Sequence, residues 1–133
     1  GATVNGPGKI ISSNDITITN SSNIGGDIEI ISGGTILIRN STLGNGVNNI
    51  SNSVVIYGTS GLKIEGNSTV NGLSIIFDGV TNVNNSTYYG AIYNSGTNCE
   101  ISSSSGRAIM GFGRVQVAGF FVSVLLGENH LEV

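Results

Sequence analysis

The chain has 133 residues, of which 10% are charged and 38% are hydrophobic, and its formal net charge is −3. Ordinary soluble domains carry about 25% charged residues and disordered chains are poor in β-branched residues, so this composition excludes disorder and favours short strands joined by turns. The basic residues are scattered, which argues against a nucleic-acid interface, and no apolar run approaches the ~18 residues of a spanning helix. We therefore expect one all-β domain over residues 1–133, with no nucleic-acid partner and no membrane span.

Apolar segments of strand length recur along the chain, and many alternate with polar residues at a period of two. In chain order, the expected strands lie at 9–12, 15–19, 27–31, 35–39, 53–57, 62–65, 73–77, 91–93 and 99–101. Clusters of Gly, Ser, Thr and Asn separate them, and such clusters are typical of turns. No window shows the 3.6-residue apolar period of an amphipathic helix, so almost no helix is expected.

Three stretches resemble copies of one unit, which consists of an apolar pair, a short polar turn and a second apolar strand. The unit that starts at Ile28 recurs at Val54, 26 residues later, and Ile56 of the second copy matches Ile92 of the third. Periods of 20–50 residues are typical of stacked architectures, so we predict strand–turn–strand units that stack as the β-arcs of a β-solenoid. The predicted repeats span residues 28–53, 54–79 and 80–105.

An antiparallel hairpin sheet is the alternative fold. Gly33 and Gly34, between two apolar strands, suit a two-residue hairpin turn because glycine tolerates a positive φ. Both arrangements give the same alternation, so the repeat alone favours stacking.

The last quarter of the chain differs from the repeats. Residues 106–127 are its most apolar part, which is typical either of a buried hairpin or of an interface strand that assembly covers. We predict that this segment closes the domain or joins subunits. The predicted interface residues are Phe112, Val115, Val117, Phe120, Phe121, Val122, Val124, Leu125 and Leu126.

Cys99 is the single cysteine, which excludes an internal disulfide framework and a cysteine-ligated zinc site within one chain. It is interpreted either as a small buried hydrophobic residue or as half of a disulfide between subunits. Six Asn-x-Ser/Thr sequons also allow surface glycosylation. They begin at Asn20, Asn40, Asn49, Asn67, Asn84 and Asn85.

No catalytic constellation stands out. The single histidine, His130, lies three residues from the last position of the sequence, and Asp27 and Glu29 are interpreted as solvated carboxylates on one strand face. No cofactor or metal site is expected. Ice binding is disfavoured because no Thr-x-Thr pattern recurs in register.

The block Tyr88–Gly96 reads Tyr-Tyr-Gly-Ala-Ile-Tyr-Asn-Ser-Gly and resembles the Gly-Gly-Ala-Ile-Tyr-Asn motif of bacterial and archaeal adhesin-like β-helix repeats. The Ile-x-Ile-x-Asn-Ser-Thr pattern of Ile36–Thr42 is similar to a coil of such right-handed parallel β-helices. This resemblance spans about residues 27–105. It implies an extracellular, non-enzymatic, elongated surface protein.

We therefore expect an extracellular structural protein at a cell or virion surface, with no enzyme activity. Its partner is expected to be itself, because strand stacking builds a fibre, a tube or a sheath. One alternative is a phage tail fibre or spike, or a cell-surface adhesin, that binds a glycan, with Tyr88, Tyr89 and Tyr93 as candidates for stacking on sugar rings. Another is a fragment of a glycan-cleaving β-helix enzyme.

Overall fold

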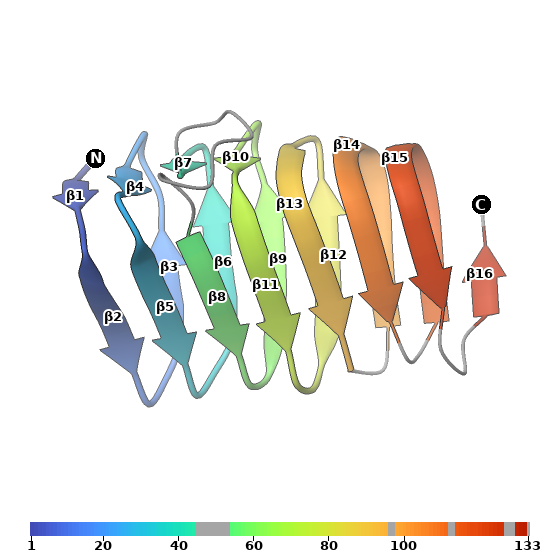
Figure 1. Ribbon diagram of the computed structural model, residues 1–133, viewed down its shortest axis with the longest axis horizontal. Helices are drawn as coiled ribbons and strands as arrows, with labels where there is room; N and C mark the ends of the chain where they lie inside the picture. The colour runs from blue at the N-terminus through green and yellow to red at the C-terminus, as the bar shows by residue number, and fades with distance from the viewer. Residues whose placement is uncertain (45–53, 96–97, 112–113, 127–129, 133) are drawn as a thin grey trace.

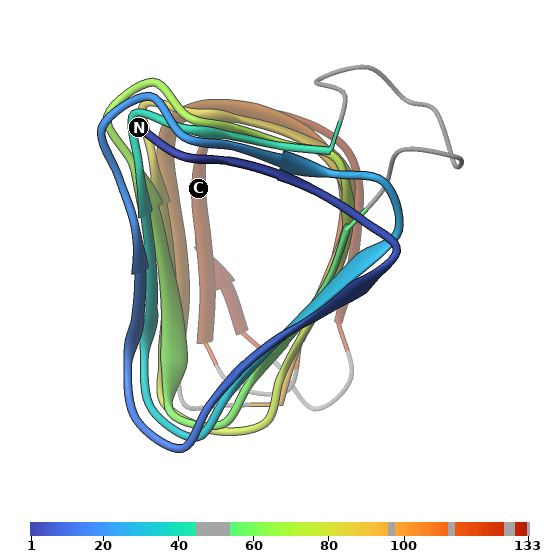
Figure 2. The ribbon, with the colours of Figure 1, turned by 90° about the vertical axis from the view of Figure 1, so that its left-hand side faces the viewer.

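The computed structural model of the chain describes residues 1–44, 54–95, 98–111, 114–126 and 130–132. They form a parallel β-solenoid whose coils succeed one another along one axis, with the two ends of the chain at opposite ends of the stack (Figure 1). Viewed along this axis, the coils enclose a three-sided cross-section (Figure 2). Across these residues every strand pair is parallel and there is no helix. The predicted stack of strand–turn–strand units is confirmed, and the antiparallel hairpin sheet is wrong.

Each of the earlier coils contributes a strand to each of three faces, and equivalent strands stack from coil to coil. The first face stacks β1 (Thr3–Asn5), β4 (Asn23–Gly25), β7 (Thr42–Leu43), β10 (Thr69–Val70) and the start of β13 (Thr87–Asn94). The second face stacks β2 (Gly8–Ser12), β5 (Ile28–Ser32), β8 (Val54–Gly58), β11 (Gly72–Ile76) and the end of β13. The third face stacks β3 (Ile16–Ile18), β6 (Ile36–Arg39), β9 (Gly61–Glu65) and β12 (Val80–Asn84).

Toward the C-terminus, two long strands continue around the corners of the solenoid. β14 (Asn98–Gly111) and β15 (Arg114–Leu126) each cross the third, first and second faces in turn, and they pair with each other along most of their length. β16 (His130–Glu132) pairs with the start of β15 on the third face. The second face therefore holds seven stacked strand segments: β2, β5, β8, β11 and the relevant parts of β13, β14 and β15.

Coil length varies along the axis. Val54 lies beside Ile28, 26 residues earlier, and this coil includes residues 45–53, which lie outside the described part of the chain. The next two coils take 18 residues each, because Ser74 lies beside both Ile56 and Ile92. The 26-residue offset of the sequence is thus one coil, and the 36-residue offset from Ile56 to Ile92 is two coils.

The core consists of ladders of inward-facing side chains. The third face contributes Ile18, Ile38, Ile64 and Val83, which are buried and in register. β-branched residues suit this role because they pack well on a pleated sheet, and burying each such side chain contributes about 1.5–3 kcal/mol. Alternation along the strands sends the residues between them to the outer surface.

The core becomes more polar in later coils. Ser74 follows Ile56 in an inward ladder of the second face, and its hydroxyl lies 2.6 Å from that of Tyr88, which is 1% exposed. Thr81 donates a hydrogen bond to the amide oxygen of Asn94 at 3.2 Å. These pairings offset the loss of hydration that burying hydroxyls and amides entails. Burial also raises the pKa of Tyr88 well above its ordinary value.

Candidate functional site

A ladder of buried serines forms the corner between the third and first faces. Ser22, Ser41, Ser68, Ser86 and Ser104 occupy equivalent positions in successive coils, and all five are buried. The backbone N–H of each of the first four donates to the Oγ of the serine in the next coil, at 3.1–3.3 Å. The Oγ atoms of these four donate in turn to backbone carbonyls two or three residues earlier, at 2.7–3.0 Å. The corner is therefore bonded both along the axis and within each coil.

An asparagine precedes three of these serines and turns the backbone. Asn40, Asn67 and Asn85 have φ values of 48°, 62° and 48°, in the left-handed region that asparagine tolerates better than most residues. In the first coil, Asn20 and Ser21 share this conformation, each with a φ of 59°. The Asn-Ser-Thr triplets are thus the signature of a corner, in which asparagine turns the chain, serine joins the ladder and threonine starts the next strand.

The predicted glycosylation positions gather at this corner. The side chains of Asn20, Asn40, Asn67 and Asn85 are exposed there, and that of Asn84 is exposed at the end of β12. Asn49 lies outside the described residues. Glycosylation itself stays a prediction. The Asn-Ser-Thr triplets also have a structural explanation, because they form the corner.

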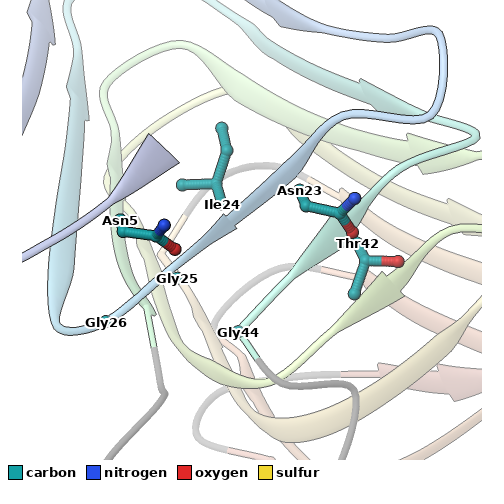
Figure 3. Close-up of a pocket in the computed structure, with 7 residues that line it drawn as sticks. All are labelled: Asn5, Asn23, Ile24, Gly25, Gly26, Thr42 and Gly44. Carbon is teal, nitrogen blue, oxygen red and sulfur yellow. The ribbon is translucent and has the colours of Figure 1, made fainter. Parts of the chain in front are cut away.

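The outer surface of the first face carries a polar hollow of about 380 Å³ (Figure 3). The amide of Asn5 lies beside Gly25, and the amide of Asn23 lies beside Thr42 of β7. A second hollow of about 170 Å³ adjoins it and shares Asn23 and Thr42. The two linings consist of uncharged side chains and glycine backbone, so they present hydrogen-bonding groups without charge. Such a surface can bind a neutral polar ligand, such as the hydroxyl groups of a sugar.

A column of apolar side chains runs along the outside of the second face. Ile11, Ile31, Tyr57, Ile75 and Tyr93 are in register from β2 to β13, and they are called the apolar stripe below. Ile11 is 66% exposed and Tyr93 is 39% exposed, and the other three are half-buried. This surface was missed from the sequence, although each apolar pair contained the signal. Because neighbouring residues of a strand face opposite ways, a pair such as Ile56-Tyr57 fills the core with one residue and the surface with the other.

The predicted apolar C-terminal segment falls mainly on β14 and β15. Within β15, the backbone places Val115 and Val117 on the third face, and Phe120 and Phe121 on the first face beside Ser105 and Gly106 of β14. Phe112 lies outside the described residues. The segment continues the solenoid rather than forming a separate unit, and its part in an interface stays a prediction. The remaining predicted interface residues lie in β15: Val122, Val124, Leu125 and Leu126.

Cys99 lies in the core, at 0% exposure, in the inward ladder that contains Leu62 and Thr81. Burial raises the pKa of its thiol to about 12, and the nearby carboxylate of Glu100 acts in the same direction. Since the thiolate is the reactive form, this environment protects the sulfur from oxidation and exchange. A disulfide between subunits would therefore require this coil to open.

Tyr88, considered for sugar stacking, is buried in the core, whereas Tyr93 of the same proposal belongs to the exposed stripe. Tyr89, the third candidate, follows Tyr88 in β13.

The ion pairs lie on the outer surface. Arg39 Nε donates to Glu65 Oε1 at 2.7 Å, and Lys63 Nζ lies 3.3 Å from Glu65 Oε2. The hydrogen bond from Arg39 holds the pKa of Glu65 below its ordinary value. Glu29 pairs with Lys9 at 3.6 Å, while Asp27 is exposed just before β5. Throughout the described ranges, no three His, Cys, Asp or Glu residues lie close enough together to hold a metal ion.

The chain matches no protein-family model, no curated protein and no solved structure at a significant level. The parallel β-solenoid is thus established by the structure alone. The part of the chain that the structure describes has no helix long and apolar enough to cross a membrane.

Proposed function

We propose that this chain is a non-enzymatic extracellular structural protein that assembles with copies of itself into a fibre, tube or sheath at a cell or virion surface. The continuity of the stack is the observation that carries this proposal. Parallel pairing joins successive coils on all three faces, and the serine ladder joins them again at a corner. A unit bonded to its neighbours around its perimeter is a stiff rod, which is what a structural element needs.

The chemistry of the described residues supports the same proposal. Five charged residues form ion pairs on the surface, and the single thiol is buried. The five are Lys9, Glu29, Arg39, Lys63 and Glu65. A surface with few titrating or oxidisable groups suits a protein that works outside the cell, where pH and redox conditions vary.

Negative-stain electron microscopy of the purified chain tests the assembly directly. We expect open-ended fibres or tubes whose width is a multiple of the rod's cross-section. The same grids with a reductant test the alternative of a disulfide between subunits: an assembly that loosens would assign Cys99 to such a bond, and the burial of Cys99 predicts no change. Discrete trimers would favour a phage fibre or spike, and uniform monomers at all concentrations would contradict self-assembly.

A glycan-binding adhesin is the second candidate, and the neutral polar hollow of Figure 3 favours it. Gly25 lines the hollow, and a Cβ added there would make ordinary contact with the carbonyl oxygen of Gly44 at 3.7 Å. Gly25→Val should therefore fill the hollow without breaking the coil. Loss of binding on a glycan array by Gly25→Val, but not by Thr17→Val on the third face, would support the adhesin. An array that shows no binding by the unmodified chain would reject it.

A further inference from the structure

The apolar stripe stands out from the other outward columns of the solenoid. On the first face the equivalent column is Thr3, Asn23, Thr42, Thr69 and Thr87. On the third face the column is Thr17, Leu37, Lys63, Asn82 and Glu100. The first-face column is polar in every coil and the third-face column in all but one, whereas the stripe is apolar in each coil from β2 to β13.

Further apolar residues widen the stripe. Val55 and Leu73 form part of the neighbouring outward column and are half-buried, and Phe77 and Val80 are exposed at the next corner. The backbone register continues the line of the stripe to Met110 in β14 and Leu125 in β15. Contiguous apolar surface of this kind on a chain so rich in polar residues marks a contact surface.

The charge of this face permits a second copy of the chain to bind there. In the outward columns of this face that the structure describes from β2 to β13, the charged residues are Lys9 and Glu29, and they pair with each other at 3.6 Å. Two such faces therefore do not repel each other, even though the whole chain carries a net charge of −3.

The dimensions of the face also suit a second copy. Seven strand segments at ~4.8 Å spacing and five residues at ~3.3 Å cover about 550 Å² per copy, or about 1,100 Å² for two. This area just exceeds the ~1,000 Å² that a specific protein interface needs. The three aliphatic side chains of the stripe offer a sugar no hydrogen bonds, so another β-sheet face is the better complement.

We propose that the apolar stripe is a lateral interface, at which two copies pack face to face and lie side by side as rods. This inference rests on the proposed structural role and names the lateral contact of the assembly, while contacts between rod ends would extend it. A self-complementary face suits two-fold symmetry, and we place the two-fold axis across the rods, so that the two copies run in opposite directions. Ile75 lies in the fourth of the seven segments, and full overlap therefore places the two Ile75 positions beside the two-fold axis.

Paired lysine variants test the interface. Ile31→Lys/Ile75→Lys adds two charges to the stripe, and Leu37→Lys/Asn82→Lys adds the same two charges at half-buried outward positions of the third face. At concentrations below those at which fibres form, analytical ultracentrifugation should show a monomer–dimer equilibrium for the unmodified chain. The stripe variant should weaken it by roughly 100-fold or more, because lysine must be desolvated to enter the interface. The third-face variant should dimerise like the unmodified chain, with circular dichroism confirming that both remain folded.

A cysteine crosslink provides a second test that needs no destabilising charge. Ile75→Cys should form a disulfide-linked dimer on mild oxidation, and Asn82→Cys should not, while the buried Cys99 stays unreactive in both.

The outcomes separate the interface from the proposed function. Association that both lysine variants retain, without the Ile75→Cys crosslink, would overturn the stripe as the interface and leave self-assembly standing. An unmodified chain that stays monomeric would overturn both. A monomer that binds a neutral polysaccharide through Tyr57 and Tyr93 would assign the stripe to a glycan instead.

Discussion

At the scale of single residues, the serine ladder is where removing one atom is expected to have a large effect. Ser68 Oγ accepts a hydrogen bond from the N–H of Ser41 at 3.2 Å and donates to the carbonyl of Glu65 at 2.7 Å. Ser68→Ala leaves the buried N–H of Ser41 without this acceptor. We expect the free energy of unfolding to fall by about 1–3 kcal/mol, as measured by urea denaturation.

Ser60→Ala is the matched control for this substitution. Ser60 Oγ donates to the carbonyl of Gly33 at 3.3 Å, but this bond is exposed and water can replace it. The free energy of unfolding should change by less than about 0.5 kcal/mol. An equal fall in the free energy of unfolding in both variants would show that the buried hydrogen bonds of the ladder contribute no more than an exposed one.

Cys99 makes the stability sensitive to alkaline pH. Its thiol has a pKa raised from 9.0 to about 12 by burial, so above pH 9 the unfolded chain loses a proton that the folded chain keeps. This difference favours unfolding, and stability should fall by up to about 1.4 kcal/mol per pH unit between pH 9 and 12. In Cys99→Ala this part of the slope should disappear, which urea denaturation at pH 8, 9 and 10 can measure. Identical slopes would mean that the thiol ionises as readily in the fold.

At the scale of elements, the corner that begins β11 depends on a glycine. Gly72 has a φ of 150°, and a Cβ there would clash with the carbonyl oxygen of Val54 in the preceding coil. Gly72→Ala should therefore lower the free energy of unfolding by at least about 2 kcal/mol. Gly25→Ala is the control, because the added methyl group meets only ordinary contacts. Thermal denaturation of each variant tests this prediction. A melting temperature unchanged by Gly72→Ala would show that position 72 accepts a side chain without strain.

The strands were predictable because their alternation is local. Apolar residues at a period of two, as in Ile28-Glu-Ile30, reveal a half-buried strand whatever it pairs with. The pairing itself was harder, because parallel and antiparallel strands share this alternation. The repeat that favoured stacking also missed one coil, the coil between Ile56 and Ile92, because Ser74 stands there in place of an apolar residue. The polar side chain of Ser74 is explained only by its contact with the buried hydroxyl of Tyr88.

The surface features were less accessible from the sequence. The serine ladder joins residues 18 to 27 positions apart, so its members look like ordinary turn residues until the coil length of each turn is known. The apolar stripe was hidden for the same reason. Tyr57, Ile75 and Tyr93 form one surface only once 18-residue coils bring them into register.

At the scale of the whole molecule, stability should change little between pH 5 and 8. Among the described residues with a shifted pKa, Glu65 is displaced downward, and Cys99 and Tyr88 are displaced upward. The contribution of Glu65 is lost only as pH falls below 4.5, and those of the other two only at alkaline pH. Scanning calorimetry at pH 5, 6, 7 and 8 should give melting temperatures within about 5 °C of one another. A larger change would reveal a titrating group that the three do not include.

Because each coil bonds only to the coils beside it, the rod also has a characteristic response to load. Tension between its two ends would be carried in series by every rung, and an end coil, supported on one side alone, would detach first. An 18-residue coil set free extends by up to about 60 Å, while the coils behind it keep their bonds. The solenoid would therefore lengthen in steps under tension, one coil at a time. When the tension is released, the unfolded coil would refold by pairing with the exposed strands at the end of the remaining stack.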